Sequence, residues 1–432
     1  MKVFAFGAIL LSAGCWAGTP AATPLKVNGP RIFEHLKGLS EFGKNPQGGV
    51  SRVAYTTEDK AGREYVLRLM REAGLTVGID VAGNLVGTRA GTDATLKPIV
   101  LGSHIDSVPE GGNYDGDVGS LGAIEVAQTL AEHGWRMRHS LQVIIFQNEE
   151  GGLLGSSALG RGLDAARLNT ISQSGKSIRD GIQFLGGDAN KIGEAKRRPG
   201  SIRAYVELHI EQGALLEQQH IQIGIVEGIV GILDSEVVVE GLANHAGTTP
   251  MDERHDAMLS AARFVDKFNS VVTSVPGRQV GTVGWIKADP GAYNVIPGKV
   301  TFGLEIRDLD VNKIKTIFAR TGEAAEQIGR LNGTTFHFSP RDISAPALTD
   351  KALQGIIGAA AKQLELSTKF MPSGAGHDAQ EMANIGPICM IFIPSVGGIS
   401  HSPKEFSNPA DIENGANVLL GTVERLEIAK DP

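Results

Sequence analysis

The sequence predicts an α/β protein in which a larger domain, built on a largely parallel sheet, is interrupted by a smaller α+β domain. The chain of 432 residues is too long for one ordinary hydrophobic core, so two domains are expected. Short apolar runs alternate with helical segments up to about residue 225, which is typical of a sheet covered by helices. A different order of elements follows Gly228, and the first rhythm returns after Pro346. The larger domain is therefore predicted to be discontinuous.

The larger domain shows clear strand and helix patterns. Apolar and β-branched runs predict buried strands over residues 99–103, 141–146 and 205–209, with a helix over residues 118–132. After Pro346 we expect a helix over residues 349–364 and a strand over residues 388–393.

The middle of the chain has its own order of elements. Strands are expected over residues 235–241, 280–287, 299–307 and 334–339, and helices over residues 252–268 and 311–330. A β-α-β-β-α-β order of this kind forms an open-faced sandwich of about a hundred residues. We therefore assign residues 231–343 to an inserted domain, and residues 23–230 together with 344–432 to the larger domain.

The N-terminus has the features of a targeting segment. A basic start, an apolar run over residues 3–11 and small residues after it predict a secretory signal peptide over residues 1–22, with a buried strand or helix as the alternative. The apolar run is too short to span a bilayer, so no stable membrane span is expected. Lipidation at Cys15 is the less favoured hypothesis because Ser12 stands where such signals usually have Leu. We expect export to a periplasm or secretion.

Composition narrows the classes of partner. The net charge is −7, and no basic stripe is present, which argues against nucleic-acid binding and favours small molecules or proteins. Cys389 lies in an apolar run and would be the only cysteine left after removal of the leader. It is therefore predicted to be a core residue, and a disulfide within the mature chain is excluded.

Side chains that can bind metal ions follow the predicted strands of the larger domain. Imidazole nitrogens and carboxylate oxygens are the ligands that Zn²⁺ and Mn²⁺ prefer, and the ends of strands are where α/β folds place their sites. Each residue also has an ordinary alternative: the pair His104 and Asp106 can be hydrogen-bonded loop residues, and Asp117 is predicted to cap the helix that follows it. The candidate groups are His104 with Asp106, Asp115 with Asp117, Glu149 with Glu150, His209, and His401.

These groups resemble a known family, the M20 metallopeptidase-like amidohydrolases. The similarity is to the branch of N-carbamoyl-L-amino acid hydrolases, β-ureidopropionases and allantoate amidohydrolases, also called the hydantoinase/carbamoylase family. It extends from about Phe33 to near the C-terminus. Beside the groups above, the matching segments are residues 48–56, 243–251, 294–298, 371–379 and 398–403.

The resemblance implies that the larger domain is catalytic and holds two divalent metal ions per subunit, Zn²⁺ or Mn²⁺. Asp106 is expected to support a histidine ligand, and Glu149 to act as the general base that takes a proton from a metal-activated water. The implied ligands are His104 and His209 for one ion, Glu150 and His401 for the other, and Asp115 as the bridge.

The inserted domain is implied to be the family's dimerisation and lid domain. His245 is expected to polarise the scissile carbonyl, arriving from the partner subunit of a homodimer. Arg307 and Asn294 are expected to hold the substrate carboxylate, which suits the guanidinium fork. Without the resemblance, a surface ion pair of Arg307 with Asp308 or Asp310 would be the favoured interpretation. The ureido end of the substrate is expected to contact Gln212 and the loop that holds Gly374 and His377.

The implied activity is the hydrolysis of a linear C–N amide bond, other than a peptide bond, in N-carbamoyl-L-amino acids or related ureido acids. One departure concerns residues 151–156, which are shorter than in the family and lack its Arg and Phe, closer to the peptidase relatives. The alternatives are an allantoate amidohydrolase, an M20 peptidase or aminoacylase, and a catalytically inactive binding protein.

Overall fold

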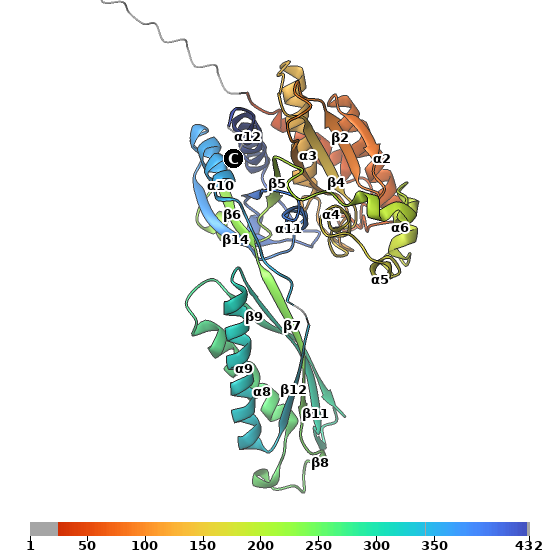
Figure 1. Ribbon diagram of the computed structural model, residues 1–432. Coiled ribbons are helices and arrows are strands. Elements are labelled where there is room, and N and C mark those ends of the chain that lie inside the picture. The colour runs from red at the N-terminus through yellow and green to blue at the C-terminus, as the bar shows by residue number, and fades with distance from the viewer. Residues whose placement is uncertain (1–24, 342, 430–432) are drawn as a thin grey trace, which may run out of the picture.

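The computed structural model describes residues 25–341 and 343–429 and contains two lobes of unequal size (Figure 1). The predicted signal peptide and Cys15 lie outside the described residues. The larger lobe holds the first and last parts of the described chain, and the smaller lobe is formed by the middle of the chain.

One mixed sheet organises the larger lobe. Among the described residues it has nine strands, in the order β1-β2-β4-β3-β5-β15-β6-β13, with β14 paired to β6. The central strands β4, β3, β5 and β15 are parallel, which confirms the predicted fold class. Antiparallel pairing at both edges was not predicted. The strands are β1 Thr76–Ile79, β2 Leu85–Arg89, β3 Ile99–His104, β4 Leu141–Phe146, β5 Ala204–Ile210, β6 Ile223–Ile229, β13 Ala347–Leu348, β14 Thr368–Ser373 and β15 Ile388–Ile393.

Helices cover both faces of this sheet, so alternate residues of each central strand enter different cores. Leu101 packs in the core formed with α1, α2, α3, α10 and α12, whereas Val100 packs with α4 and α11 on the other face. Cys389 is fully buried, as predicted. The long C-terminal helix α12 was not predicted. The helices are α1 Gly29–Leu39, α2 Thr57–Glu72, α3 Asp117–Glu132, α4 Leu154–Gly160, α5 Ala165–Leu168, α6 Ile178–Phe184, α7 Leu215–Gln218, α10 Lys351–Gln363, α11 Asp378–Met382 and α12 Pro409–Ile428, with 3₁₀ segments η1 Ala189–Ala195 and η3 Val396–Gly398.

The smaller lobe follows the predicted order, β7-α8-β9-β11-α9-β12. Its antiparallel sheet has the strand order β12-β7-β11-β9, and α8 and α9 pack on one face (Figure 1). The short pair β8 and β10 lies at the end remote from the larger lobe. The elements are β7 Gly231–Glu240, β8 Asn244–His245, η2 Met251–Glu253, α8 Ala257–Thr273, β9 Val280–Asp289, β10 Val295–Ile296, β11 Lys299–Asp308, α9 Val311–Asn332 and β12 Thr335–Pro340.

The chain crosses between the lobes at two adjacent places. β6 ends at Ile229 and β7 begins at Gly231, and the return segment pairs with this crossing through Ile232 and Ser344. Between residues 25 and 429, residue 342 aside, no helix has the length and apolar character that crossing a membrane requires.

Candidate metal centre

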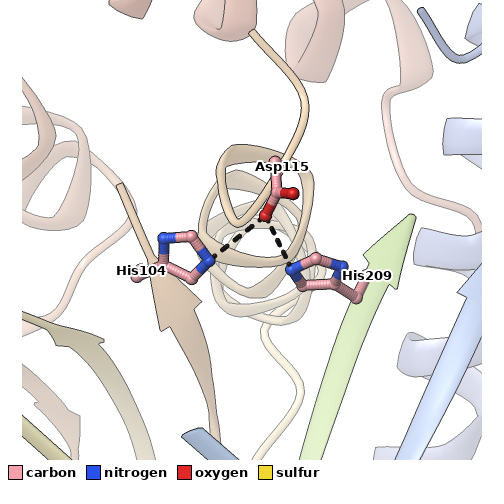
Figure 2. Close-up of side chains that lie close together, drawn as sticks. All are labelled: His104, Asp115 and His209. Carbon is pink, nitrogen blue, oxygen red and sulfur yellow. Dashed lines mark ion pairs between the residues drawn. The ribbon is translucent and has the colours of Figure 1, made fainter. Parts of the chain in front are cut away.

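The predicted ligands and the predicted base come from neighbouring parallel strands of the larger lobe. His104 ends β3, Glu149 and Glu150 follow β4, His209 lies near the end of β5, and His401 follows β15. Because these strands are parallel neighbours, their carboxyl ends meet at one edge of the sheet. Asp115 reaches the same place from the loop before α3 (Figure 2).

Two buried histidines face one oxygen of Asp115 (Figure 2). His104 Nε2 lies 3.4 Å and His209 Nε2 3.2 Å from Asp115 Oδ1. The other ring nitrogen of each histidine is close to a backbone carbonyl, His104 Nδ1 to Asp106 O at 3.0 Å and His209 Nδ1 to Ile210 O at 2.9 Å. These bonds assign the proton to Nδ1 and direct the Nε2 lone pairs toward Asp115, which is how a protein prepares histidine for a metal ion.

The second oxygen of Asp115 faces a different group. His401 Nε2 lies 3.4 Å from Asp115 Oδ2 and also 3.4 Å from Glu150 Oε2. The ligand atoms within each of the two groups lie within 4.8 Å of one another. His104 Nε2 is buried and makes no hydrogen bond to the residues that the structure describes. A set of imidazole nitrogens and carboxylate oxygens with this spacing fits divalent cations, with Asp115 shared between two positions.

Glu149 and Glu150 are adjacent in the chain but face different groups. Glu149 Oε2 lies 3.8 Å from His104 Nε2, whereas Glu150 Oε2 lies 3.4 Å from His401 Nε2. The backbone N–H groups of both glutamates donate to the carboxylate of Asp106, at 3.1 and 3.2 Å. This carboxylate lies 3.9 Å from His104 Nδ1, which bonds the backbone carbonyl of Asp106 instead. Asp106 therefore fixes the glutamate pair directly and His104 through the main chain.

The crowding of charges shifts the pKa of each group. Burial raises the pKa of Glu149 well above its usual range, and the nearby carboxylates add to this rise. Burial and the charge of Asp115 raise the pKa of Glu150 to about 7. A hydrogen bond to Asp115 raises the pKa of His401 to about 9. Although burial opposes it, the imidazoles hold the pKa of Asp115 well below its usual range. The centre therefore stabilises positive charge beside Asp115.

Arg52, within one of the matching segments, was not recognised as part of the site. Its guanidinium is buried, donates to Asp117 Oδ2 at 2.6 Å and to the carbonyl of Ile105 at 2.6 Å, and so joins both ligand loops. The prediction that Asp117 caps α3 was wrong, because Gly116 is the N-cap residue and the Asp117 carboxylate binds Arg52. Gly116 has φ of 67°, and a Cβ there would overlap the ring of His104.

Residues predicted to contact the ureido end also border the centre. Gln212 Nε2 donates to Asp115 Oδ2 at 2.6 Å. The His377 ring lies 4.4 Å from that of His209, and its two nitrogens make no hydrogen bond to any described residue. Leu153, in the segment that departs from the family, lies beside Gly376, which precedes His377 in the chain.

Arg307 makes neither of the ion pairs considered from the sequence. Its Nε and Nη2 donate to the two carboxylate oxygens of Glu305, at 2.6 and 2.9 Å, because residues two apart on β11 share a face. Its Nη1 donates to Gly374 O at 2.7 Å. Arg307 therefore reaches from the smaller lobe to the loop that holds His377.

His245 and Asn294 are not brought to this centre within one chain. His245 lies in β8 and is exposed, and the carbonyl of Asn294 accepts a hydrogen bond from Ala246 at 2.9 Å. This pair of segments lies at the far end of the smaller lobe (Figure 1). Along β11, the eight steps from Lys299 to Arg307 cover roughly 26 Å at about 3.3 Å per residue.

Comparison with known proteins agrees with this geometry. Residues 100–425 match the family described as Peptidase family M20/M25/M40. The chain is 39% identical over 405 residues to an N-carbamoyl-L-amino acid amidohydrolase from Geobacillus stearothermophilus, covering 93% of this chain and 99% of the relative. It is 38% identical to a ureidoglycolate hydrolase from Arabidopsis thaliana, covering 94% of this chain and 88% of the relative.

A solved structure gives the same result. A hydantoinase/carbamoylase family amidase from Burkholderia multivorans matches with a TM-score of 0.85 at 36% identity, covering 93% of this chain and 98% of that chain. The chain therefore belongs to the M20 peptidase family, in the branch of the N-carbamoyl-L-amino acid amidohydrolases and hydantoinase/carbamoylase family amidases.

Proposed function

We propose that this protein is a metal-dependent hydrolase that cleaves the C–N bond between the carbamoyl carbon and the amino-acid nitrogen of N-carbamoyl-L-amino acids. The observation that carries the proposal is the position of Asp115, whose two oxygens each face a separate set of ligands. The 39% identity to an N-carbamoyl-L-amino acid amidohydrolase supports this substrate class. One water is consumed, and the carbamate released with the amino acid breaks down to ammonia and carbon dioxide.

Two divalent cations, Zn²⁺ or Mn²⁺, are the proposed cofactors. His104 and His209 would hold one, Glu150 and His401 the other, and Asp115 would contact both, which suits the observed distances. When bound, the cations supply a Lewis acid for the carbonyl and lower the pKa of a water.

Glu149 is the proposed general base. It is buried, it is not a member of either ligand group, and its pKa is raised by burial, so it can accept a proton and release it again. We propose that Glu149 takes a proton from the attacking water and delivers it to the leaving nitrogen. Asp106 keeps Glu149 in place through the backbone N–H that it accepts.

Arg307 is the proposed partner of the substrate carboxylate. Glu305 occupies two of the five guanidinium N–H groups and Gly374 O a third, which leaves two N–H groups for a ligand. Gln212 donates to Asp115, and the ring of His377 lies beside that of His209. The nitrogens of His377, which make no hydrogen bond to any described residue, can bond the ureido group.

A homodimer is proposed because His245 and Asn294 lie far from the centre of their own chain. β9 forms one edge of the smaller sheet, and Trp285, Ile286 and Tyr293 near it are exposed. An edge strand with exposed apolar side chains can pair with a second copy of the chain. Such a copy would supply His245 and Asn294 to the opposite centre, where His245 would polarise the carbonyl.

Export is also proposed, on the basis of residues 1–22 alone. Removal of the leader and transfer to a periplasm or secretion can be tested by N-terminal sequencing of the protein isolated from each cell fraction.

A substrate panel tests the proposed activity. Purified protein reconstituted with Zn²⁺ or Mn²⁺ is incubated with N-carbamoyl-L-amino acids, N-carbamoyl-β-alanine, allantoate, ureidoglycolate and dipeptides, and both ammonia and amino-acid products are measured. We expect the highest kcat/KM for an N-carbamoyl-L-amino acid. Ureidoglycolate is included because of the 38% identity to a ureidoglycolate hydrolase, and a preference for it, for allantoate or for dipeptides would replace the proposed substrate.

A further inference from the structure

We propose that Glu405 is a positioning residue that holds the loop of Asp115 and the loop of His401 in register for cation binding. This inference rests on the proposed metal centre and assigns to it a residue outside the candidate ligand groups.

Each carboxylate oxygen of Glu405 serves one of the two loops. Oε1 accepts the backbone N–H groups of Tyr114 at 2.9 Å and Asp115 at 3.0 Å. Oε2 accepts the backbone N–H of His401 at 3.2 Å and lies 2.8 Å from the hydroxyl of Ser400. Glu405 is only 4% exposed, so water does not compete for these donors.

These bonds connect segments that are far apart in the sequence. Tyr114 and Glu405 are separated by 291 residues. The two proposed ligands whose backbone N–H groups Glu405 accepts, Asp115 and His401, belong to the same candidate group, which also contains Glu150. The Ser400 hydroxyl also lies 2.9 Å from Asp115 Oδ2, so it extends the same connection to the shared carboxylate.

The site requires a carboxylate and not merely a polar side chain. The donors converge from two directions, and a carboxylate can accept on both oxygens, whereas an amide has one oxygen and presents its NH₂ group to the other loop. Gly112 makes room for this arrangement, because a Cβ there would overlap the carboxylate of Glu405. Residues that orient metal ligands typically change metal affinity by about 10- to 100-fold when they are substituted.

The test compares Glu405→Gln and Glu405→Asp with a matched control, Glu427→Gln. Glu427 is also buried and accepts backbone N–H groups across a similar separation, from Arg138 at 2.5 Å and His139 at 3.3 Å. Arg138 and His139 precede β4, at the end of the sheet opposite the metal centre. Glu427→Gln therefore measures how much stability is lost when a buried carboxylate that accepts backbone N–H groups is replaced by an amide, and it leaves the ligand loops unchanged.

Binding of Mn²⁺ to each folded apo protein is followed by calorimetry, and Co²⁺ loading by visible absorption. We expect Glu405→Gln to weaken the more weakly bound ion at least about tenfold and to alter the Co²⁺ spectrum, Glu405→Asp to retain more of the affinity, and Glu427→Gln to change only the melting temperature. Mn²⁺ affinities of Glu405→Gln within twofold of the wild type would overturn the positioning role alone. A wild-type protein that bound no divalent ion would overturn both this inference and the proposed function.

Discussion

Arg52 and Asp117 form an ion pair of 2.6 Å in which both side chains are 1% exposed. Arg52 also donates to the carbonyls of Leu39 and Phe42, each at 3.1 Å, so the pair connects the end of α1 to the start of α3. A buried ion pair of this kind contributes little more to the stability of the fold than apolar residues of similar volume would. The loss of one partner, however, leaves an uncompensated buried charge, which is strongly destabilising.

Asp117→Asn should therefore lower the free energy of unfolding by about 3–5 kcal/mol. Urea denaturation at neutral pH measures the change. Glu72→Gln is the control, because its pair with Arg68 is exposed and should change the same quantity by less than about 1 kcal/mol. If the two substitutions lowered the free energy of unfolding equally, the buried charge of Arg52 would not be costly without Asp117, contrary to our expectation.

Glu149→Gln and Glu150→Ala should separate the two adjacent glutamates. Loss of a general base lowers kcat by about 10²–10⁴-fold, so Glu149→Gln should lose this much activity and keep its metal content. Glu150→Ala should instead lose one of the two proposed ions, because Glu150 faces His401 in the second group. Steady-state kinetics and elemental analysis measure both. A Glu149→Gln variant with near-native kcat would reject Glu149 as the base.

Arg307→Ala should raise KM for carboxylated substrates roughly 10- to 100-fold, because a hydrogen bond to a charged group contributes about 1.5–3 kcal/mol. Arg278→Ala is the control for the loss of an arginine that connects the two lobes, because Arg278 forms an ion pair with Glu227 of the larger lobe. Initial rates over a range of substrate concentrations measure KM. If Arg307→Ala left KM unchanged while its fold was intact, another residue would hold the carboxylate.

Cation affinity should rise with pH. The pKa of His401 is raised to about 9 by its hydrogen bond to Asp115, and that of Glu150 to about 7 by burial and the charge of Asp115. Both groups must lose their protons to bind the ion proposed for Glu150 and His401, so binding of this ion should release about one proton between pH 7 and 8.5 and up to about two below pH 7. Calorimetric titration of Mn²⁺ at pH 6 and pH 8.5, in buffers of different ionisation enthalpy, counts these protons. His401→Ala should reduce the dependence, and an affinity independent of pH would contradict the assignment of His401.

The sequence predicted the central strands to within a few residues, because fully buried strands are continuous apolar runs bounded by turns. The strands outside the central four, β1, β2, β6, β13 and β14, were not predicted, since they are short or their apolar residues are interrupted by glycine and polar residues. The helix α12 was also missed, although Ile412, Ala416 and Val423 follow a helical spacing and are buried.

The sequence by itself determined which residue types stand at the strand ends, His104, His209 and the pair of Glu149 and Glu150, because strand periodicity and the turns after it are local properties. Only the tertiary structure decided that the two oxygens of Asp115 face different groups, that Arg307 pairs with Glu305, and that Glu405 joins the loops of Asp115 and His401. The direction of a side chain and its choice among several charged neighbours depend on burial and on contacts between residues up to nearly 300 positions apart, which local sequence patterns do not encode.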